Sequence, residues 1–233
     1  MNTIETQESF TNLEIYHILK NEIVSLKLTP GQYISEIDIS KRFHVSRTPI
    51  REVFKRLEYD NLIKAIKNKG TIITPIDFKA ISQFMYIREK LELGLLEDVI
   101  SNIPVESIAN LSLILVKQRK VIIDQSNSLI TRSLAFFELD NEFHKTIFHI
   151  ANKTSTWDML MNMMPDYQRF RAVSAEFNSE DMLLELYAHH EIILKALEQG
   201  NFTDLKQVYK DHIYNGVSTF QKILKEKEDY FVN

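Results

Sequence analysis

The sequence predicts a mainly α-helical protein in two parts: an N-terminal module of three short helices and a small β-hairpin, then an antiparallel bundle of about six long helices. Two observations predict this. Apolar residues recur at helical spacing along most of the 233 residues, whereas strict alternation is confined to residues 62–73. The chain also has only five glycines and five prolines. Because helix breakers are so scarce after Pro75, we expect long helices there.

The first part begins with an amphipathic helix over residues 13–26, which should support the two helices that follow. Ser35-Glu36-Ile37-Asp38 resembles a capping box opening the second helix. Ser46 is a suitable N-cap for the third, which begins at Arg47. Pro49 falls in the first turn, where the N–H that proline lacks would have no intrahelical partner.

The third helix has two contrasting faces. Its apolar residues lie on one face at spacings of three and four, and its basic and hydroxyl residues lie on the other. An ordinary solvated helix would show the same pattern. A front of guanidiniums and a hydroxyl is also what reading base edges and phosphates in a major groove requires. The apolar set is Ile50, Val53, Phe54 and Leu57, and the candidate DNA-binding set is Ser46, Arg47, Thr48, Arg51 and Lys55.

A hairpin is predicted directly after this helix. Asn61 stands where a left-handed residue can end a helix, and residues 62–73 alternate around Lys67-Asn68-Lys69-Gly70. The two preceding helices and this hairpin predict a winged helix-turn-helix. Lys67, Lys69 and Gly70 at the tip of the wing are further candidate DNA contacts.

The distribution of charge supports a phosphate-facing surface. The net charge of the whole chain is −4. Residues 41–69 nevertheless hold nine basic and three acidic residues, whereas residues 78–233 hold 17 basic and 22 acidic ones. The positive charge is therefore local, as expected of a nucleic-acid-binding surface on an otherwise acidic protein.

The run from Leu26 to Pro75 resembles the winged-helix domain of the GntR family of bacterial transcription regulators. Leu28-Thr29-Pro30-Gly31, residues 45–51 and Lys69-Gly70-Thr71 occur in the family's order and spacing. The family usually has glycine where this chain has His44 and Asn61, two residue types that tolerate positive φ. Ile37 replaces a DNA-contacting arginine of the fatty-acid-responsive branch, so that contact is not carried over. The resemblance implies a domain of residues 1–77 that binds a double-stranded DNA operator.

Helices are expected over six ranges in the second part, with no strand outside the wing. Pro104 suits the first turn of the second helix, and Gly200 follows the fifth as a C-terminal stop. An antiparallel bundle follows from these lengths and short connections. The six ranges are 78–102, 105–126, 130–151, 155–173, 180–199 and 202–227.

Polar residues interrupt three apolar stripes of this bundle. Asp140 and His144 lie one turn apart in the helix predicted over residues 130–151, and His190 and His212 each stand within the apolar stripe of a later helix. The neighbouring His189 points about 100° away from His190. Inward polar groups need partners, so each histidine is either a hydrogen-bonded core residue or a metal ligand. Together the four donors suit a divalent ion, with zinc, nickel, manganese and iron not distinguishable.

The remaining candidates are weaker. Arg88 shares a face with apolar residues and either anchors a small carboxylate by bidentate hydrogen bonds or pairs with carboxylates of the bundle. The other histidines are expected to be structural or solvated, and the methionines near residue 160 to fill a helical core rather than bind a soft metal. These are His17, His44 and His149, and Met159, Met161, Met163 and Met164.

The same region resembles the all-helical FCD effector domain found in one GntR subfamily, the FadR-like regulators. Residues 139–144 carry the Asp-x-x-x-His pattern of that domain, and residues 190–197 and 211–213 carry its two later histidines. The resemblance implies that residues 78–233 form an effector-binding domain with Asp140, His144, His190 and His212 as ligands of a divalent metal. It then covers nearly the whole chain.

These observations favour a cytoplasmic, homodimeric repressor that binds a palindromic operator and responds to a small carboxylate effector. No stretch reaches the roughly 18 to 20 apolar residues of a membrane span, and the absence of cysteine excludes thiolate metal sites. Two alternatives remain: a metalloenzyme, which would lack a clear general base and leave the winged helix unexplained, and a constitutive DNA-binding protein whose metal is structural.

Overall fold

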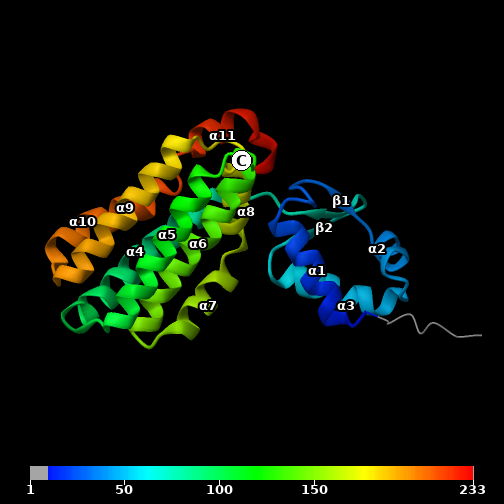
Figure 1. The fold of residues 1–233 in the computed structure, drawn as a ribbon. Helices are drawn as coiled ribbons and strands as arrows, with labels where there is room; N and C mark the ends of the chain where they lie inside the picture. The colour runs from blue at the N-terminus through cyan, green and yellow to red at the C-terminus, as the bar shows by residue number, and fades with distance from the viewer. Residues whose placement is uncertain (1–9, 233) are drawn as a thin grey trace, which may run out of the picture. The chain divides into compact units, whose positions relative to one another are not determined.

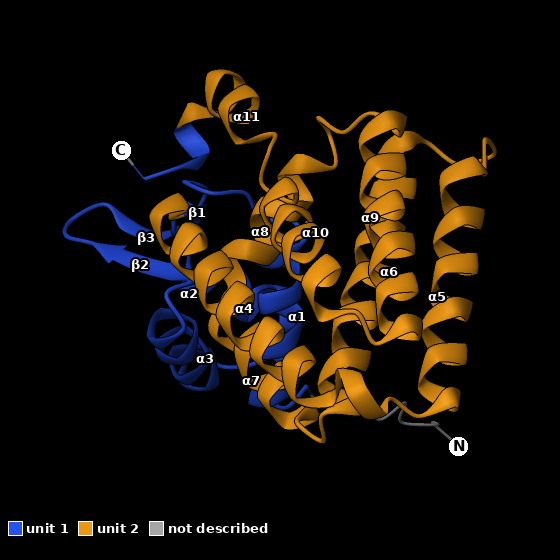
Figure 2. Ribbon diagram, turned by 90° about the vertical axis from the view of Figure 1, so that its left-hand side faces the viewer, with its two compact units in different colours: residues 1–76, 229–233 blue, residues 77–228 orange. Residues whose placement is uncertain are grey.

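The computed structural model describes residues 10–232, which form two compact units (Figures 1 and 2). One unit ends at Ile76 and also includes the C-terminal segment from Asp229, and the other is Asp77–Glu228. Within the first unit, Ile76 forms a parallel bridge with Phe231, and its N–H donates to the carbonyl of Tyr230 at 2.8 Å. No pattern in the sequence indicated this C-terminal return. The division at residue 77 into two domains stays a prediction.

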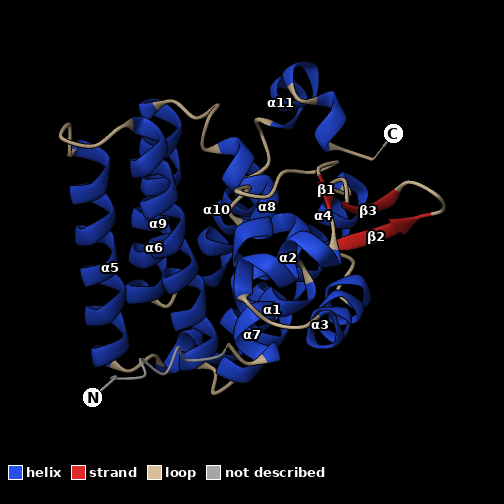
Figure 3. Cartoon of the chain, turned by 90° about the vertical axis from the view of Figure 1, so that its right-hand side faces the viewer, coloured by secondary structure: helices blue, strands red, loops and turns tan. Residues whose placement is uncertain are grey.

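In its described residues, the first unit contains three α-helices and a small antiparallel sheet of strand order β1-β3-β2 (Figure 3). In the β2–β3 hairpin, Ile63 pairs with Ile73 and Ile66 pairs with Gly70, as a wing requires. The elements are α1 (Asn12–Val24), β1 (Tyr33–Ile34), α2 (Glu36–Phe43), α3 (Arg47–Tyr59), β2 (Ile63–Ile66) and β3 (Gly70–Ile73).

One strand contradicts the expectation that the wing alone is extended. Tyr33 and Ile34 form β1, which pairs with Ile72 and Thr71 of β3. Two residues are too short to show an alternating pattern, so the sequence held no signal for this strand. Its pairing satisfies backbone groups on the side of β3 that β2 leaves open.

The helix ends explain how the helix-turn-helix is formed. Ser35 accepts a hydrogen bond from the N–H of Asp38, which is half of a capping box. Ser46 is the N-cap residue of α3, but its side chain accepts no cap hydrogen bond, contrary to our expectation. Pro49 occupies the third helical position and has no N–H to donate, so the N–H of Thr48 is the one donor left for such a bond. His44 (φ 54°) and Asn61 (φ 56°) adopt the left-handed conformation that the turns require.

The core of the first unit joins all three helices to the sheet. Ile50 and Leu57 of α3 are fully buried against α1, in a cluster that extends to Ile73. Both oxygens of Glu22 on α1 accept from Arg42 on α2, at 2.6 and 2.5 Å. The first helix therefore supports the other two, as predicted.

The second unit is entirely helical in the part of the chain that the structure describes. Its α-helices are α4 (Phe78–Val99), α5 (Val105–Ile123), α6 (Leu129–Ile150), α7 (Thr154–Met163), α8 (Pro165–Ser174), α9 (Glu180–Gln199), α10 (Phe202–Asn215) and α11 (Phe220–Glu226), with a 3-10 turn at Ile100–Asn102.

Two of the six predicted long helices are each divided into two. The segment predicted as 155–173 breaks before Pro165, whose ring prevents continuation and which opens α8 at its first position. The segment predicted as 202–227 breaks at Gly216, because glycine is a poor helix former. The placement of the methionines was also partly wrong, since Met159 and Met163 are exposed.

The bundle brings α4, α6, α9 and α10 around one interior. Helix α5 packs on α6 and α9, and α10 packs on α9 and α4 (Figures 2 and 3). Phe136, Leu183 and Ile122 are fully buried where α5, α6 and α9 meet. Within the described residues, no helix is long and apolar enough to cross a membrane.

The core of the first unit can be tested with two isoleucines. Replacing the fully buried Ile50 in Ile50→Ala should lower the free energy of unfolding by about 2–5 kcal/mol, because it removes buried surface and leaves a cavity. Ile37→Ala is the matched control: Ile37 is 47% exposed, so its loss should cost no more than about 0.5 kcal/mol. Calorimetric melting of both variants measures the difference, and equal losses would contradict the predicted core.

Candidate metal centre and nucleic-acid interface

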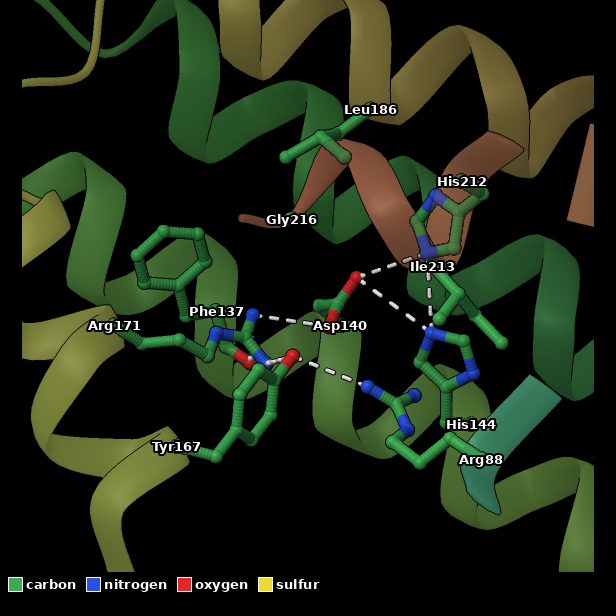
Figure 4. Close-up of a pocket in the computed structure, with 10 residues that line it drawn as sticks. All are labelled: Arg88, Phe137, Asp140, His144, Tyr167, Arg171, Leu186, His212, Ile213 and Gly216. Carbon is green, nitrogen blue, oxygen red and sulfur yellow. Dashed lines mark hydrogen bonds and ion pairs between the residues drawn. The ribbon is translucent and has the colours of Figure 1, made fainter. Parts of the chain in front are cut away.

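Four donor groups predicted on three helices meet inside the second unit. Asp140 and His144 come from α6, His190 from α9 and His212 from α10, and one donor atom of each lies within 4.8 Å of the others. All four side chains are buried. Figure 4 shows Asp140 facing His144 and His212. The helical phase argument therefore identified residues that do converge, and their role as metal ligands stays a prediction.

Four of the six pairs of donor atoms are spaced as ligands of one small ion would be. The Nε2 atom of His212 lies 3.1 Å from Nε2 of His144 and 3.1 Å from Nε2 of His190. One oxygen of Asp140 lies 3.4 Å from Nε2 of His190 and of His212, and 3.8 Å from that of His144. Ligands about 2.0–2.2 Å from a common ion lie roughly 3–3.6 Å apart.

Hydrogen bonds outside the cluster determine which ring nitrogens carry protons. Nδ1 of His144 lies 2.6 Å from the carboxylate of Glu92, and Nδ1 of His190 lies 2.9 Å from the side-chain amide oxygen Oε1 of Gln118. Both acceptors require a proton on Nδ1, so the Nε2 atoms of these rings carry lone pairs directed into the cluster. Stacking of Phe143 on His190, with ring centroids 4.0 Å apart, further restrains that ring.

Hydrogen bonds from the available protons cannot satisfy all the lone pairs of the cluster, whereas a bound cation can. His212 can place one proton on Nε2, but that proton can bond only one of the two facing lone pairs, on His144 or His190. The Nδ1 atom of His212 is buried and has no hydrogen-bond partner among the described residues. Three imidazoles and a carboxylate therefore present more acceptors than donors to a shared centre. The residues fit a divalent metal held by nitrogen and oxygen ligands.

The electrostatics keep the ligands in the forms that bind metal. Burial lowers the pKa values of His144 and His190, and burial together with His190 lowers the pKa of His212 to about 4. Burial alone would raise the pKa of Asp140, but Arg171, whose guanidinium lies 2.9 Å from the carboxylate, holds it well below its usual value. At neutral pH the cluster thus contains neutral imidazoles and an ionised carboxylate.

Arg88 lies next to this cluster but is already paired. Its Nε donates to Glu92 at 2.7 Å and its Nη1 donates to the hydroxyl of Tyr167 at 3.1 Å. Glu92 also accepts from Tyr209 at 2.5 Å. Burial alone would raise the pKa of Glu92, yet Arg88 and His144 lower it to about 2. Arg88 therefore has the carboxylate partner that our alternative interpretation described, and its role toward an effector is untested.

A small cavity opens beside the cluster. Its lining includes Asp140, His144 and His212 of the cluster, together with Arg88, Arg171 and Tyr167 (Figure 4). Its volume of about 10 Å³ is room for about one water molecule. A larger ligand can enter only if lining side chains move.

Sequence reasoning missed several partners of the ligands. Gln118 is a fully buried polar residue in the apolar stripe of α5, a signal of the kind that identified His190 and His212. Glu92 follows Arg88 by one helical turn and could have been found as its partner. Arg171 gave no signal, because its contact with Asp140 depends on how α8 packs against α6.

His189 and the three histidines that we expected to be structural or solvated are absent from the cluster. His189 is only partly buried and offers no ligand atom to the group. His149 is exposed and lies 3.4 Å from the hydroxyl of Thr154. His17 and His44 belong to the other unit, and both are exposed.

The candidate DNA-binding side chains are exposed on the first unit. At the N-cap of α3 and along that helix these are Ser46, Arg47, Thr48, Arg51 and Lys55, and at the turn of the wing they are Lys67, Lys69 and Gly70. The apolar back of α3 is buried, so the two predicted faces are separated as expected. Asn68 (φ 61°) and Gly70 (φ 107°) form the turn. Which of these side chains touch DNA stays a prediction.

Comparison with known proteins identifies the family. Residues 11–73 match the model of bacterial regulatory proteins of the gntR family, and residues 83–215 match the FCD domain. Together they cover most of the chain, which belongs to the GntR family of DNA-binding transcription regulators and carries an FCD domain. This is a family of regulators and not of enzymes, which excludes the metalloenzyme alternative.

Relatives match over nearly their full length. The chain is 30% identical over 233 residues to the HTH-type transcriptional repressor RspR of Escherichia coli K12, covering 98% of each chain. It is 26% identical to the uncharacterized HTH-type transcriptional regulator YdhC of Bacillus subtilis, covering 93% of this chain and 94% of the relative. The fold is similar to that of E. coli McbR/YncC, with a TM-score of 0.69 at 16% identity, covering 91% of this chain and 97% of that one.

The metal centre can be tested by comparing neighbouring histidines. Purified His144→Ala, His190→Ala and His212→Ala should each lose bound metal and melt at a lower temperature than the metal-loaded wild type, because each removes a ligand from the native state. His189→Ala and His149→Ala, which lie outside the cluster, should retain metal. Metal content by plasma mass spectrometry decides: equal content in the His190 and His189 variants would exclude the predicted centre.

Proposed function

We propose that this chain is a transcriptional repressor whose operator binding is controlled by a small carboxylate bound at a divalent metal in the FCD domain. The observation that carries the proposal is the buried cluster in which Asp140 and three imidazole Nε2 atoms face one centre, while Nδ1 of His144 and of His190 is hydrogen-bonded outside it. Such a set is costly to bury without a cation.

Asp140, His144, His190 and His212 would hold the metal. Four protein ligands leave coordination positions open on an ion that prefers five or six, and the metal would supply a Lewis acid that attracts anionic oxygen. The identity of the ion, among zinc, nickel, manganese and iron, is left open by this donor set.

A carboxylate is the ligand class that the cavity favours. Two guanidiniums, of Arg88 and Arg171, and the hydroxyl of Tyr167 line it beside Asp140. A carboxylate could accept from these donors while a metal binds its other oxygen. Because the cavity is about 10 Å³, binding must displace lining groups, and Arg88 would exchange part of its contact with Glu92 for the ligand. Such displacement makes binding favour one conformational state over another.

The DNA-binding end of the proposal rests on the recognition helix α3 and the wing. Two copies of the chain would place two such helices in successive major grooves of a palindromic operator, so a homodimer is part of the proposal. A role as repressor is supported by the relative RspR, which is named as one. We place the protein in the cytoplasm, where its DNA lies.

One titration tests the function as a whole. The operator is a duplex selected by the full-length protein from a random library, and its binding is followed by fluorescence anisotropy with metal-loaded and metal-stripped protein. Small mono- and dicarboxylates are added in turn. If an acid releases the operator from the metal-loaded protein but not from the metal-stripped protein, the result supports a metal-dependent sensor. Indifference of the loaded protein to every acid would instead leave a DNA-binding protein with a structural metal.

The recognition helix predicts two different effects on DNA. Arg47→Ala or Arg51→Ala should cost about 1–3 kcal/mol of operator binding without loss of folding, because exposed guanidiniums would read base edges. Lys67→Ala and Lys69→Ala should weaken binding to all sequences and reduce its salt dependence, because phosphate contacts release counterions. Wild-type operator affinity in both arginine variants would contradict the assignment of α3.

Arg88 can be tested without leaving Glu92 unpaired. Arg88→Ala would bury an uncompensated carboxylate, so we choose Arg88→Lys, which keeps the positive charge but loses the guanidinium fork. This variant should retain its metal and bind the operator, but bind the releasing carboxylate about tenfold more weakly. Lys90→Ala on the same helix is the control, since Lys90 is exposed. Unchanged carboxylate affinity by calorimetry would remove Arg88 from the effector site.

A further inference from the structure

The two arginines of the recognition helix share one carboxylate that sequence reasoning did not single out. Nη2 of Arg47 lies 2.9 Å from Oε2 of Glu36, and Nε of Arg51 lies 3.1 Å from the same oxygen. Glu36 is the first residue of α2, and Arg47 is the first residue of α3. The helix-turn-helix itself therefore brings the three side chains together.

This contact offsets an unfavourable arrangement on α3. Arg47 and Arg51 are four residues apart on a helix, so their charges face each other and repel. One carboxylate between them reduces that repulsion and restrains both long side chains. The hydrogen bond from Arg47 lowers the pKa of Glu36, so this group is ionised at neutral pH.

The pairing leaves donors available for a base. Arg51 uses Nε toward Glu36, so its terminal Nη1 and Nη2 do not take part in that contact. A pair of parallel N–H groups is what the O6 and N7 atoms of guanine accept. An arginine already held in one orientation loses less conformational entropy when it binds than a free one.

The same carboxylate would disfavour binding that does not read bases. Arg47 and Arg51 remain about half exposed, and Glu36 is 28% exposed, so the contacts are weak enough to be adjusted on DNA. A negative charge on this surface repels phosphates wherever the arginines meet only backbone. Its cost is therefore largest on unrelated sequences and smallest where the guanidiniums bind guanine.

We propose that Glu36 is a specificity-determining residue that positions Arg47 and Arg51 for base reading. The inference rests on α3 being the recognition helix, as proposed above. Glu36 is a positioning residue in this account, because it acts through the two arginines and not through a base contact of its own.

The test compares two glutamates on the same unit. Glu36→Gln removes the charge that both arginines share. Glu52→Gln removes the charge of a more exposed carboxylate on α3, which pairs with Lys55 at 2.9 Å. Each full-length variant is titrated with the selected operator and with an unrelated duplex of equal length, at several salt concentrations. The readout is the ratio of the two affinities, and melting temperatures verify folding.

Glu36→Gln is expected to lower this ratio about tenfold, through weaker operator binding and equal or tighter binding of unrelated DNA. Glu52→Gln should leave the ratio within about twofold. If Glu36→Gln raises both affinities together, as a plain change of charge would, the proposal is overturned. The proposal is also overturned if both affinities fall together with the melting temperature, because Glu36 would then act only on the stability of the fold.

A double-mutant cycle separates positioning from direct contact. In a chain that already carries Arg47→Ala and Arg51→Ala, Glu36→Gln should change the ratio no further, because its partners are gone. An undiminished effect there would overturn the proposed route. The arginine variants also distinguish the two proposals. If they bind the operator normally, α3 is not the recognition helix. If they lose operator binding but Glu36→Gln keeps the wild-type ratio of affinities, α3 remains the recognition helix and only the role of Glu36 is excluded.

Discussion

The burial of charge and lone pairs in the helical unit is the constraint on which its arrangement depends. Asp140 is ionised in the interior, and its partners are Arg171 on one side and three imidazoles on the other. Each partner comes from a helix that must stay in place, because removing one leaves a buried charge without compensation. The polar cluster therefore specifies how α6, α8, α9 and α10 pack, in addition to the apolar core.

A second layer of contacts extends this constraint to α4 and α5. Glu92 bonds His144, Tyr209 and Arg88, and Gln118 bonds His190. These bonds select the ring nitrogen that carries the proton and so aim the lone pairs inward. Stability and chemistry cannot be separated here. The groups that compensate the buried charges are also the groups that orient the lone pairs toward a cation.

The DNA-binding unit shows the opposite balance: apart from the buried Glu22, its described charged side chains are exposed or partly exposed. Its fold relies on an apolar core and on the Glu22–Arg42 pair, while the front of α3 stays exposed. Surface ion pairs contribute little to stability, so the contacts of Glu36 with two arginines are free to serve recognition. A unit with a packed apolar core thus carries exposed side chains on α3 that can rearrange when DNA binds.

The sequence by itself determined the helix positions, the wing, the family and the four inward donors, because helical period and turn residues are local properties. His190 and His189 could be told apart because a helix turns by about 100° per residue. Breaks at Pro165 and Gly216 had local causes that we underweighted. Contacts such as Arg171 with Asp140, and Glu36 with Arg47 and Arg51, join different helices. Only the tertiary structure decided them, since helical period says which face is buried but not which neighbour it meets.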